Sequence, residues 1–315
     1  MIWRKLGLIF EPPQGIWWME SHAQVPFTVE IDDFIRVFFS TRTAQDENGQ
    51  FVSYSGFVDI DPKDNWKVKG ISKKPILELG VTGEFDEFGI MAGSTIEFNG
   101  SIFLYYCGWQ RLKSVPYNWA IGAATTNDYT SFEKLSNAPI IGPRLNEPYL
   151  HACPIVYNVN DELVMFLLTG DRWIKDSTGK LESVYTLKQA KSKNGIDWSA
   201  ASDAILPAQT KDECQTSCSI FDYNGKQTMV FSYRSGLGFR SNRDAAYKIG
   251  FATLDDAGQW NRNDNAISFI SEYDDSWDDL MMAYPHVFSY EEKYYMLYCG
   301  DEFGKHGFGI AELVE

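Results

Sequence analysis

Tyr295-Met-Leu-Tyr-Cys-Gly-Asp301 is the last of five similar stretches that are rich in aromatic and aliphatic residues. The other four are Arg36-Val-Phe-Phe-Ser-Thr-Arg42, Phe103-Leu-Tyr-Tyr-Cys-Gly-Trp109, Met165-Phe-Leu-Leu-Thr-Gly-Asp171 and Met229-Val-Phe-Ser-Tyr-Arg-Ser235. Their first residues stand 67, 62, 64 and 66 positions apart. A near-constant period indicates an array of similar units, none of which buries its apolar face alone. Five β-rich units predict an all-β fold, a five-bladed β-propeller, in which residues far apart in sequence meet at one central site.

Each unit contains further strands around the repeated one. An upstream stretch of small, uncharged residues, such as Leu150-His-Ala-Cys-Pro-Ile155, suits an innermost strand near the axis. After the third strand comes a turn that ends in an aromatic residue, best seen in Ser192-Lys-Asn-Gly-Ile-Asp-Trp198, where Asn-Gly favours a tight turn and Trp198 is expected to pack between blades. Residues 1–10 read as a strand that supplies the outer strand of the last blade and closes the ring. We predict one domain over residues 1–315, with blades at about 20–70, 86–140, 147–205, 213–265 and 278–315 plus 1–10.

Composition narrows the classes of function. The formal net charge of −15 argues against a nucleic acid or an anionic membrane as partner, since phosphate binding needs clustered Lys and Arg. No run of 18 apolar residues is present, so no membrane helix is predicted. The N-terminus lacks the apolar segment of a signal peptide, and we expect a cytoplasmic protein. The five cysteines are expected to be free thiols, and no metal or cofactor is indicated.

The position before each innermost strand is expected to face the mouth of the central funnel, and it is acidic in every unit. The acids are Glu20, Asp86, Glu147, Glu213 and Asp278. Crowded acids raise some pKa values, and glycosidic-bond chemistry pairs a protonated acid with an ionised carboxylate. We predict Glu147 or Glu213 as general acid and Asp86 as partner carboxylate, with Glu20 and Asp278 in substrate binding. The alternative is that these acids cap turns or bond backbone amides.

Basic and aromatic residues near the same strand ends complete the predicted substrate-binding set. Arg172 and Arg234 follow the second strands of units three and four, and His306 lies in a loop of unit five. Arginine suits bidentate binding of a carboxylate or phosphate. Two histidines and two aromatic residues join the set: His22, His151, Trp109 and Tyr149. The alternatives are that the arginines pair with the acids and that the rings and histidines serve ordinary packing.

Several segments carry a resemblance to a known group of enzymes. They are Ser21-His-Ala-Gln-Val-Pro26, Phe38-Phe-Ser-Thr-Arg42, Phe85-Asp-Glu-Phe-Gly-Ile-Met91, Tyr105-Tyr-Cys-Gly-Trp109, Val115-Pro-Tyr117, Glu147-Pro-Tyr149, Ser232-Tyr-Arg234, Tyr284-Pro285 and His306-Gly-Phe-Gly309. With them, nearly the whole chain resembles the five-bladed propeller enzymes of glycoside hydrolase families 32, 43, 68 and 130. Within that group it is most similar to glycosylase-like proteins of bacterial surface-polysaccharide biosynthesis. Two positions depart from the pattern. Ser21-His-Ala23 stands where family 43 has an Asp general base, and Ser217-Cys218 stands where the subgroup has an Arg-Pro pair.

The resemblance and the acids together predict an enzyme that acts on a glycosidic linkage in surface-glycan metabolism, with a carbohydrate or sugar phosphate as substrate. Hydrolysis, phosphorolysis and glycosyl transfer stay open, and the expected cytoplasmic location favours the last two. The alternative, from another class, is a non-catalytic propeller that binds a glycan or a sugar nucleotide.

Overall fold

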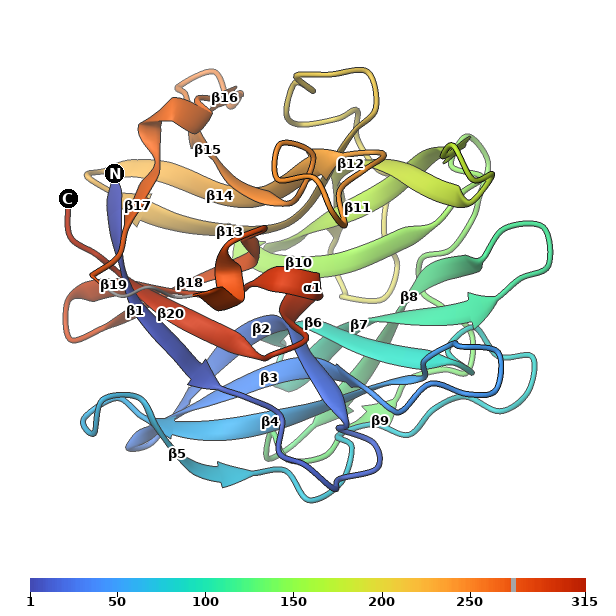
Figure 1. Cartoon of the computed structure of the whole chain (residues 1–315), viewed down its shortest axis with the longest axis horizontal. Helices are drawn as coiled ribbons and strands as arrows, with labels where there is room; N and C mark the ends of the chain where they lie inside the picture. Colours follow the sequence, from blue (N-terminus) through green and yellow to red (C-terminus); the bar gives the residue numbers. More distant parts are fainter. Residues whose placement is uncertain (273–275) are drawn as a thin grey trace.

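The computed structural model describes residues 1–272 and 276–315, and this part of the chain is almost entirely β-structure (Figure 1). Within these two ranges the helical elements are the one-turn α1 (Asp301–Gly304) and two 3₁₀ turns, η1 (Asp264–Ala266) and η2 (Ser276–Asp278). The predicted all-β class is confirmed. Among the described residues, no helix has the length and apolar character needed to span a membrane.

The largest sheet consists of two antiparallel groups. The first group contains β2 (Ser21–Ile31), β3 (Phe34–Arg42), β4 (Ser53–Asp61) and β5 (Lys67–Ile71). The second group contains β6 (Gly89–Phe98), β7 (Ser101–Arg111), β8 (Tyr117–Thr126) and β9 (Glu133–Lys134). One parallel pair, Ser53 with Gly89, joins the groups. Each group therefore corresponds to one unit of the sequence repeat.

Three further sheets contain the other units. The third unit forms β10 (His151–Val159), β11 (Glu162–Lys175) and β12 (Leu181–Ser192). The fourth forms β13 (Glu213–Tyr223), β14 (Lys226–Ser235), β15 (Lys248–Leu254) and β16 (Trp260–Arg262). The last sheet contains β18 (Ala283–Tyr290), β19 (Lys293–Cys299), β20 (Phe308–Leu313), β1 (Ile2–Phe10) and β17 (Ser268–Ile270). All five units thus contain consecutive antiparallel strands of similar order.

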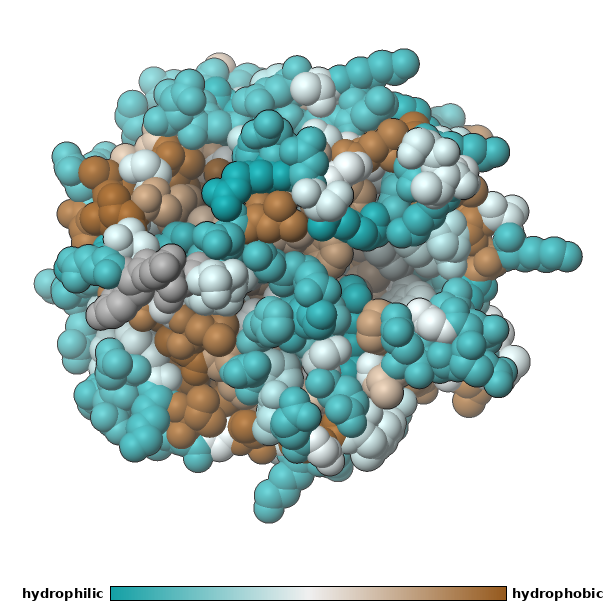
Figure 2. Space-filling view, viewed as in Figure 1, coloured by the Kyte–Doolittle hydropathy of each residue, from teal (hydrophilic) through white to brown (hydrophobic). Residues whose placement is uncertain are grey.

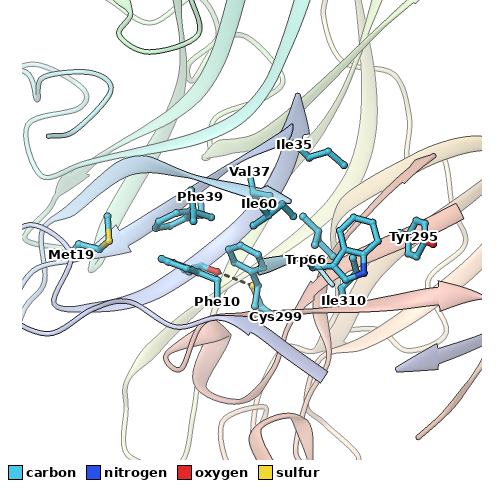
Figure 3. Close-up of a cluster of buried hydrophobic side chains, with 14 of the residues drawn as sticks. Phe10, Met19, Ile35, Val37, Phe39, Ile60, Trp66, Tyr295, Cys299 and Ile310 are labelled. Carbon is cyan, nitrogen blue, oxygen red and sulfur yellow. Dashed lines mark hydrogen bonds between the residues drawn. The ribbon is translucent and has the colours of Figure 1, made fainter. Parts of the chain in front are cut away.

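The N-terminal strand belongs to the last sheet, as predicted for residues 1–10. β1 runs antiparallel to β20, with Trp3 opposite Leu313 and Phe10 opposite Phe308. Figure 1 shows the two chain termini near each other beside this sheet. Side chains of the first unit and the last sheet also share one apolar core, in which Phe10 lies 4.9 Å from Phe39, ring to ring (Figure 3). The two ends of the chain are therefore held together by strand pairing and by packing.

Each innermost strand contains a shift of register at a corresponding position. The shifts interrupt the pairing of β2 with β3, β6 with β7, β10 with β11, β13 with β14, and β18 with β19. The residues at the shifts are Val25, Gly93, Cys153, Ser217 and Tyr284. All but the glycine have a left-handed backbone, with φ between 43° and 58°, which is rare for residues with a side chain. Such bulges bend a strand and redirect its side chains.

The five innermost strands contact one another in a cycle: β2 with β6, β6 with β10, β10 with β13, β13 with β18, and β18 with β2. Hydrogen bonds from backbone to side chain connect neighbours in this cycle. The N–H of Val156 donates to Ser94 Oγ at 3.1 Å, and the N–H of Val287 donates to Ser219 Oγ at 2.9 Å. In the described residues none of the four sheets closes on itself, so contacts between sheets bring the innermost strands together.

Tryptophans at the ends of units pack against the preceding unit in the cycle. Trp198 lies edge-on against Tyr105 of β7, with ring centroids 5.6 Å apart, as expected for an aromatic residue between units. Trp66 contacts Tyr295 of β19 at 4.5 Å in the same way. The aromatic residue that ends the turn of a unit therefore packs across the boundary to the neighbouring unit.

Candidate functional site

A pocket of about 190 Å³, here called the central pocket, lies where the five innermost strands meet. Each strand contributes a residue at or beside its register shift: Val25, Gly93, Cys153, Thr216 and Tyr284. The bulges therefore bring residues from five distant segments into one wall. Pockets for drug-sized ligands measure roughly 300–1,000 Å³, so this pocket suits one small group such as a single sugar ring. The molecular face in Figure 2 is largely hydrophilic and is hollowed to the right of its centre.

Flat aromatic rings form part of the pocket wall. Tyr117 and Trp119 of β8 stack with centroids 4.5 Å apart and planes 17° apart, and both line the pocket. Trp173 supports Tyr117 edge-on at 5.2 Å. Burial raises the pKa of Tyr117 to about 12, so its hydroxyl stays protonated at neutral pH and hydrogen bonds Ser183 at 3.0 Å. A rigid, flat wall of this kind can pack against the apolar face of a sugar ring.

Glu182 of β12 is the carboxylate that lines the central pocket, within the part of the chain that the structure describes. It is only 4% exposed. Its Oε1 and Oε2 accept from Arg240 Nη1 and Nη2 at 2.6 and 3.3 Å, and Lys180 Nζ lies 3.2 Å from Oε1. Arg240 itself lies over the ring of Phe239 at 4.2 Å. The pocket thus contains one acid, held in a bidentate pair with an exposed arginine.

Two further arginines line the pocket, and their hydrogen-bond partners are neutral. Arg234, which is 5% exposed, donates from Nε to the Tyr185 hydroxyl at 3.2 Å and from Nη1 to the backbone oxygens of Ser235 and Gly236. Arg42 donates from Nε to Gln24 Oε1 at 3.2 Å. Burial, and to a smaller extent the charge of Arg240, lowers the pKa of Arg42. The guanidinium groups are held in place without a neutralising carboxylate among the described residues.

A pair of buried tyrosines lies beside Arg234. The hydroxyls of Tyr185 and Tyr247 lie 2.5 Å apart, and both residues line the pocket. Burial raises the pKa of Tyr185 well above its usual value, so its hydroxyl is neutral. These two hydroxyls fix one edge of the Arg234 guanidinium.

The predicted acids of units two and five lie outside the central pocket and occupy equivalent sites. Asp86 is fully buried, accepts a hydrogen bond from the Tyr106 hydroxyl at 3.1 Å and pairs with Lys134 Nζ at 2.7 Å. Asp278 repeats this arrangement with the Tyr298 hydroxyl at 3.0 Å and Lys5 Nζ at 2.7 Å. Lys134 belongs to β9 and Lys5 to β1, each of which is the fourth strand counted outward from the innermost strand of its unit. Each aspartate therefore ties the start of an innermost strand to an outer strand.

The predicted acids of units three and four are also ion-paired. Glu213 accepts from Arg262 of β16 at 2.6 Å, which again ties an inner to an outer strand. Glu147 accepts from Arg144 Nε at 2.5 Å and from the N–H of Ala201 at 2.7 Å. Burial alone would raise the pKa of Glu147, but these hydrogen bonds lower it overall. A lowered pKa opposes the protonated form that a general acid needs. The catalytic roles of Glu147, Glu213 and Asp86 stay a prediction.

Of the predicted binding residues, Arg234 lines the central pocket. Arg172 and Tyr149 line a separate surface groove, which also contains Glu147 and Glu213. There, Arg172 pairs with Asp171 and, at 2.5 Å, with Asp212. The structure thus places Arg172, Tyr149 and the two glutamates together, away from the central pocket.

The remaining predicted binding residues are scattered around the innermost strands. His151 is buried and contacts Glu147 at 3.2 Å, and burial lowers its pKa to about 4. Burial lowers the pKa of His22 to about 2, and its Nδ1 lies 2.8 Å from Ser21 Oγ. Trp109 lies against Gly89, where an added Cβ would stand 1.5 Å from the indole nitrogen. Glu20 and His306 are exposed. The described residues contain no group of three or more His, Cys, Asp or Glu that could hold a metal ion.

The binding-residue prediction missed several residues of the pocket, chiefly Arg42, Glu182 and Gln24. One signal was present: an arginine ends the repeated strand in units one and four, and β3 and β14 place Arg42 and Arg234 opposite the starts of β2 and β13. Glu182 gives no such signal, because the long hairpin of β11 and β12 brings it to the pocket. The five cysteines are free as predicted, and Cys107 and Cys153 line the pocket.

Two proteins of Mycobacterium tuberculosis are similar to this protein over their whole length. They are uncharacterized protein MT1551 (strain CDC 1551 / Oshkosh) and uncharacterized protein Rv1502 (strain ATCC 25618 / H37Rv). Each is 31% identical to it, over 316 and 314 residues respectively, and each match covers 99% of both sequences. No family model matches the sequence.

Solved structures of similar fold are glycoside hydrolases and related enzymes. A glycoside hydrolase has a TM-score of 0.75 at 16% identity, over 99% of this protein and 91% of its own length. A thermostable family-43 glycoside hydrolase has a TM-score of 0.64 at 14% identity, over 94% and 90%. A third structure comes from the GH130 family of mannoside phosphorylases, which contains glycoside hydrolases that target β-1,2 mannosidic linkages in Candida mannan. It has a TM-score of 0.61 at 15% identity, over 97% of this protein and 94% of its own length. At such identities the likeness shows a glycosidase-like fold.

Proposed function

The chain belongs to the same family as the two mycobacterial proteins and has a glycosidase-like fold, and from this premise we propose that it acts on a glycosidic linkage whose terminal sugar lies in the central pocket. We further propose that its five antiparallel groups are the blades of a β-propeller and that β1 closes the last blade. The cycle of contacts among the innermost strands and the pairing of β1 with β20 support this arrangement.

The observation that carries the functional proposal is the combination of groups in one small pocket. The flat aromatic pair Tyr117 and Trp119 lines the same pocket as the buried acid Glu182. Aromatic faces bind a sugar ring, and a carboxyl group can exchange a proton with the glycosidic oxygen. The pocket stands at the meeting point of the innermost strands, where a propeller gathers its functional residues.

The number of acids favours one reaction class among the three that the sequence leaves open. Hydrolysis by a pair of carboxylates needs two acids on either side of the bond. The described wall of the pocket supplies Glu182 alone, so we propose transfer to inorganic phosphate, an anionic nucleophile that needs no second carboxylate as base. A phosphate oxygen bonds to the anomeric carbon, the glycosidic C–O bond breaks, and the leaving oxygen takes the proton from Glu182. The proton carried by the hydrogen phosphate then restores Glu182 to its acid form. Surface-glycan metabolism is the setting that the sequence resemblance suggests for such a transfer.

One observation favours a second candidate, a non-catalytic glycan-binding protein. Both oxygens of Glu182 accept from Arg240, and this pairing leaves no free oxygen to carry the proton that an acid must donate. Arg240 is exposed, and its guanidinium would have to move away from one oxygen of Glu182 before that oxygen could carry the proton for catalysis. A protein that only binds sugar needs no such movement.

Turnover of a disaccharide panel, with and without inorganic phosphate, tests the proposal and separates the two candidates. Removal of a general acid lowers rates by about 10²–10⁴-fold, so we expect that loss in Glu182→Gln, with sugar binding retained. Glu147→Gln and Glu213→Gln are the matched variants of the rival acids and should keep most activity. Full activity of Glu182→Gln would refute the assigned acid, and binding without turnover in the wild type would favour the second candidate.

A further inference from the structure

Resting on the proposed function for the sugar-binding part, we infer that the central pocket binds an oxyanion, a carboxylate or a phosphate, between Arg42 and Arg234. The two arginines come from units one and four, and both line the pocket. The ligand class is therefore an anionic sugar or a sugar together with phosphate, rather than a neutral glycan alone.

Arg234 supplies the first half of the evidence. Its side chain is buried, and its partners are the Tyr185 hydroxyl and two backbone oxygens, all of them uncharged. The guanidinium lies 3.6 Å from the ring of Phe239, so one face is covered by an aromatic side chain. No carboxylate of the described chain lies within ion-pair distance of it. A positive charge is thus held in a largely apolar place without a counter-ion.

Arg42 supplies the second half. It is half-buried at the end of β3, and its hydrogen-bond partner is the amide oxygen of Gln24. Gln24 is itself buried and lines the pocket. A glutamate at that position would have neutralised the arginine, but glutamine orients the guanidinium and leaves its charge unmatched. Arg42 is likewise free of ion pairs with described residues.

The contrast with other arginines shows that unpaired burial is not general in this protein. Outside the pocket the buried arginines have carboxylate partners: Arg36 pairs with Asp59 at 2.7 Å, and Arg262 with Glu213 at 2.6 Å. Burying a charge without a partner is unfavourable, and the cost is removed when an opposite charge arrives. A chain with a net charge of −15 has many acids, yet none is placed beside these two arginines in the described residues. An incoming anion is the partner that the geometry leaves room for.

The chemistry of the two groups specifies an oxyanion. Guanidinium forks match the paired oxygens of a carboxylate or phosphate, and such charge-assisted hydrogen bonds are stronger than neutral ones. Burial raises the pKa of Tyr185 well above its usual value, so its hydroxyl stays neutral and does not compete for the arginine as an anion. Aromatic residues around the site exclude water and strengthen the attraction.

Calorimetric titration of the full chain at low salt tests this inference. The probes are galacturonate and glucuronate, galactose 1-phosphate, inorganic phosphate, and the neutral sugars galactose and glucose. We expect at least one anionic probe to bind about tenfold or more tightly than its neutral counterpart and to lose that advantage in Gln24→Glu, which places a carboxylate beside Arg42. The probe that binds identifies the kind of anion. Binding of a uronate indicates a sugar carboxylate, binding of galactose 1-phosphate indicates a sugar phosphate, and binding of phosphate alone indicates an acceptor anion.

Matched variants keep the outcome interpretable. Arg42→Gln should also remove the preference, whereas Arg243→Gln removes an equal charge from an exposed residue outside the pocket and should leave it unchanged. Melting curves confirm that each variant is folded. Equal binding of neutral and anionic sugars overturns the inference but leaves the proposed function standing. Phosphate binding combined with no binding of any sugar probe, whether phosphate is present or not, supports the inference and contradicts the proposed function. Anion binding that survives in both Gln24→Glu and Arg42→Gln overturns the assignment to these arginines.

Discussion

The acids at the starts of the innermost strands and the arginines of the central pocket are both buried charges, but their surroundings are opposite. Asp86, Asp278 and Glu213 each meet a cation from an outer strand. Arg42 and Arg234 meet neutral oxygens. A paired charge contributes to holding a unit together, whereas the unpaired arginines are the charges for which we propose a ligand. Repetition of a charged residue along the chain therefore indicates a structural role at least as readily as a functional one.

The largest expected effect comes from breaking one of the paired sites. Arg262→Met leaves Glu213 buried without its cation, and removal of one partner of a buried ion pair costs about 3–5 kcal/mol. The free energy of unfolding, measured by urea denaturation, should fall by that amount. The double variant Arg262→Met/Glu213→Met should recover part of the loss, because Glu213 is gone but Asp264, which pairs with Arg262 at 2.8 Å, still lacks its cation. A loss below about 1 kcal/mol in the single variant would show that Glu213 is not held by this pair.

The pH dependence of stability distinguishes the surroundings of the acids from the arginines of the pocket. Arginine does not titrate in the accessible pH range, whereas His151, beside Glu147, does. Burial lowers the pKa of His151 to about 4, compared with 6.5 in the unfolded chain. Below pH 6.5 His151 is protonated in the unfolded chain but stays neutral in the folded protein until about pH 4. The contribution of neutral His151 to the free energy of unfolding is therefore complete above pH 6.5 and is lost as pH falls toward 4. Between pH 7 and 5 we expect His151 to account for about 2 kcal/mol of lost stability.

Urea denaturation at pH 7 and pH 5 checks this value. His151→Gln should have a smaller pH dependence than the wild type, while Arg42→Gln should have the same dependence as the wild type. An unchanged dependence in His151→Gln would mean that the histidine is protonated in the folded protein.

The sequence was sufficient to predict the strands and their grouping, because the period of the repeat and the apolar pattern are local signals. It also predicted the pairing of residues 1–10 with the last strands, since the fifth unit is short of an outer strand. The acids before the innermost strands could be predicted because they occupy a repeated position. The sequence does not show, however, that Lys134 and Lys5 of outer strands pair with two of them. That contact joins residues that lie far apart in the sequence.

The central pocket could not be predicted in the same way. Its wall depends on bulges at residues such as Val25 and Cys153, whose left-handed backbone has no local sequence signal. Apart from Arg42 and Arg234 near the ends of repeated strands, its charged residues belong to single units: Glu182 to unit three and Arg240 to unit four. The proposed site thus depends mainly on residues that depart from the repeat, whereas the paired acids occupy a repeated position.

The equivalence of the Asp86 and Asp278 sites can be tested by matched substitutions. Asp86→Asn and Asp278→Asn each keep an acceptor for a tyrosine hydroxyl but remove the charge that faces a lysine. We expect each to lower the free energy of unfolding by about 1–2 kcal/mol and to leave sugar binding unchanged. Calorimetry with a bound sugar and urea denaturation measure the two effects. A loss of ligand affinity in either variant would place that acid in the functional site and weaken the division between the two regions.

The smallest expected effect is on the stability of the ligand-free pocket. Arg42→Met removes a half-buried charge that has no carboxylate partner among the described residues, and an apolar chain of similar length replaces it. Replacement of such a charge is neutral or stabilising, so the free energy of unfolding should stay the same or rise by about 1 kcal/mol. The same substitution should abolish stabilisation by the oxyanion found in the calorimetric screen. A loss of more than about 2 kcal/mol without ligand would show that Arg42 stabilises the fold itself, and the contrast between paired acids and unpaired arginines would then fail at its central residue.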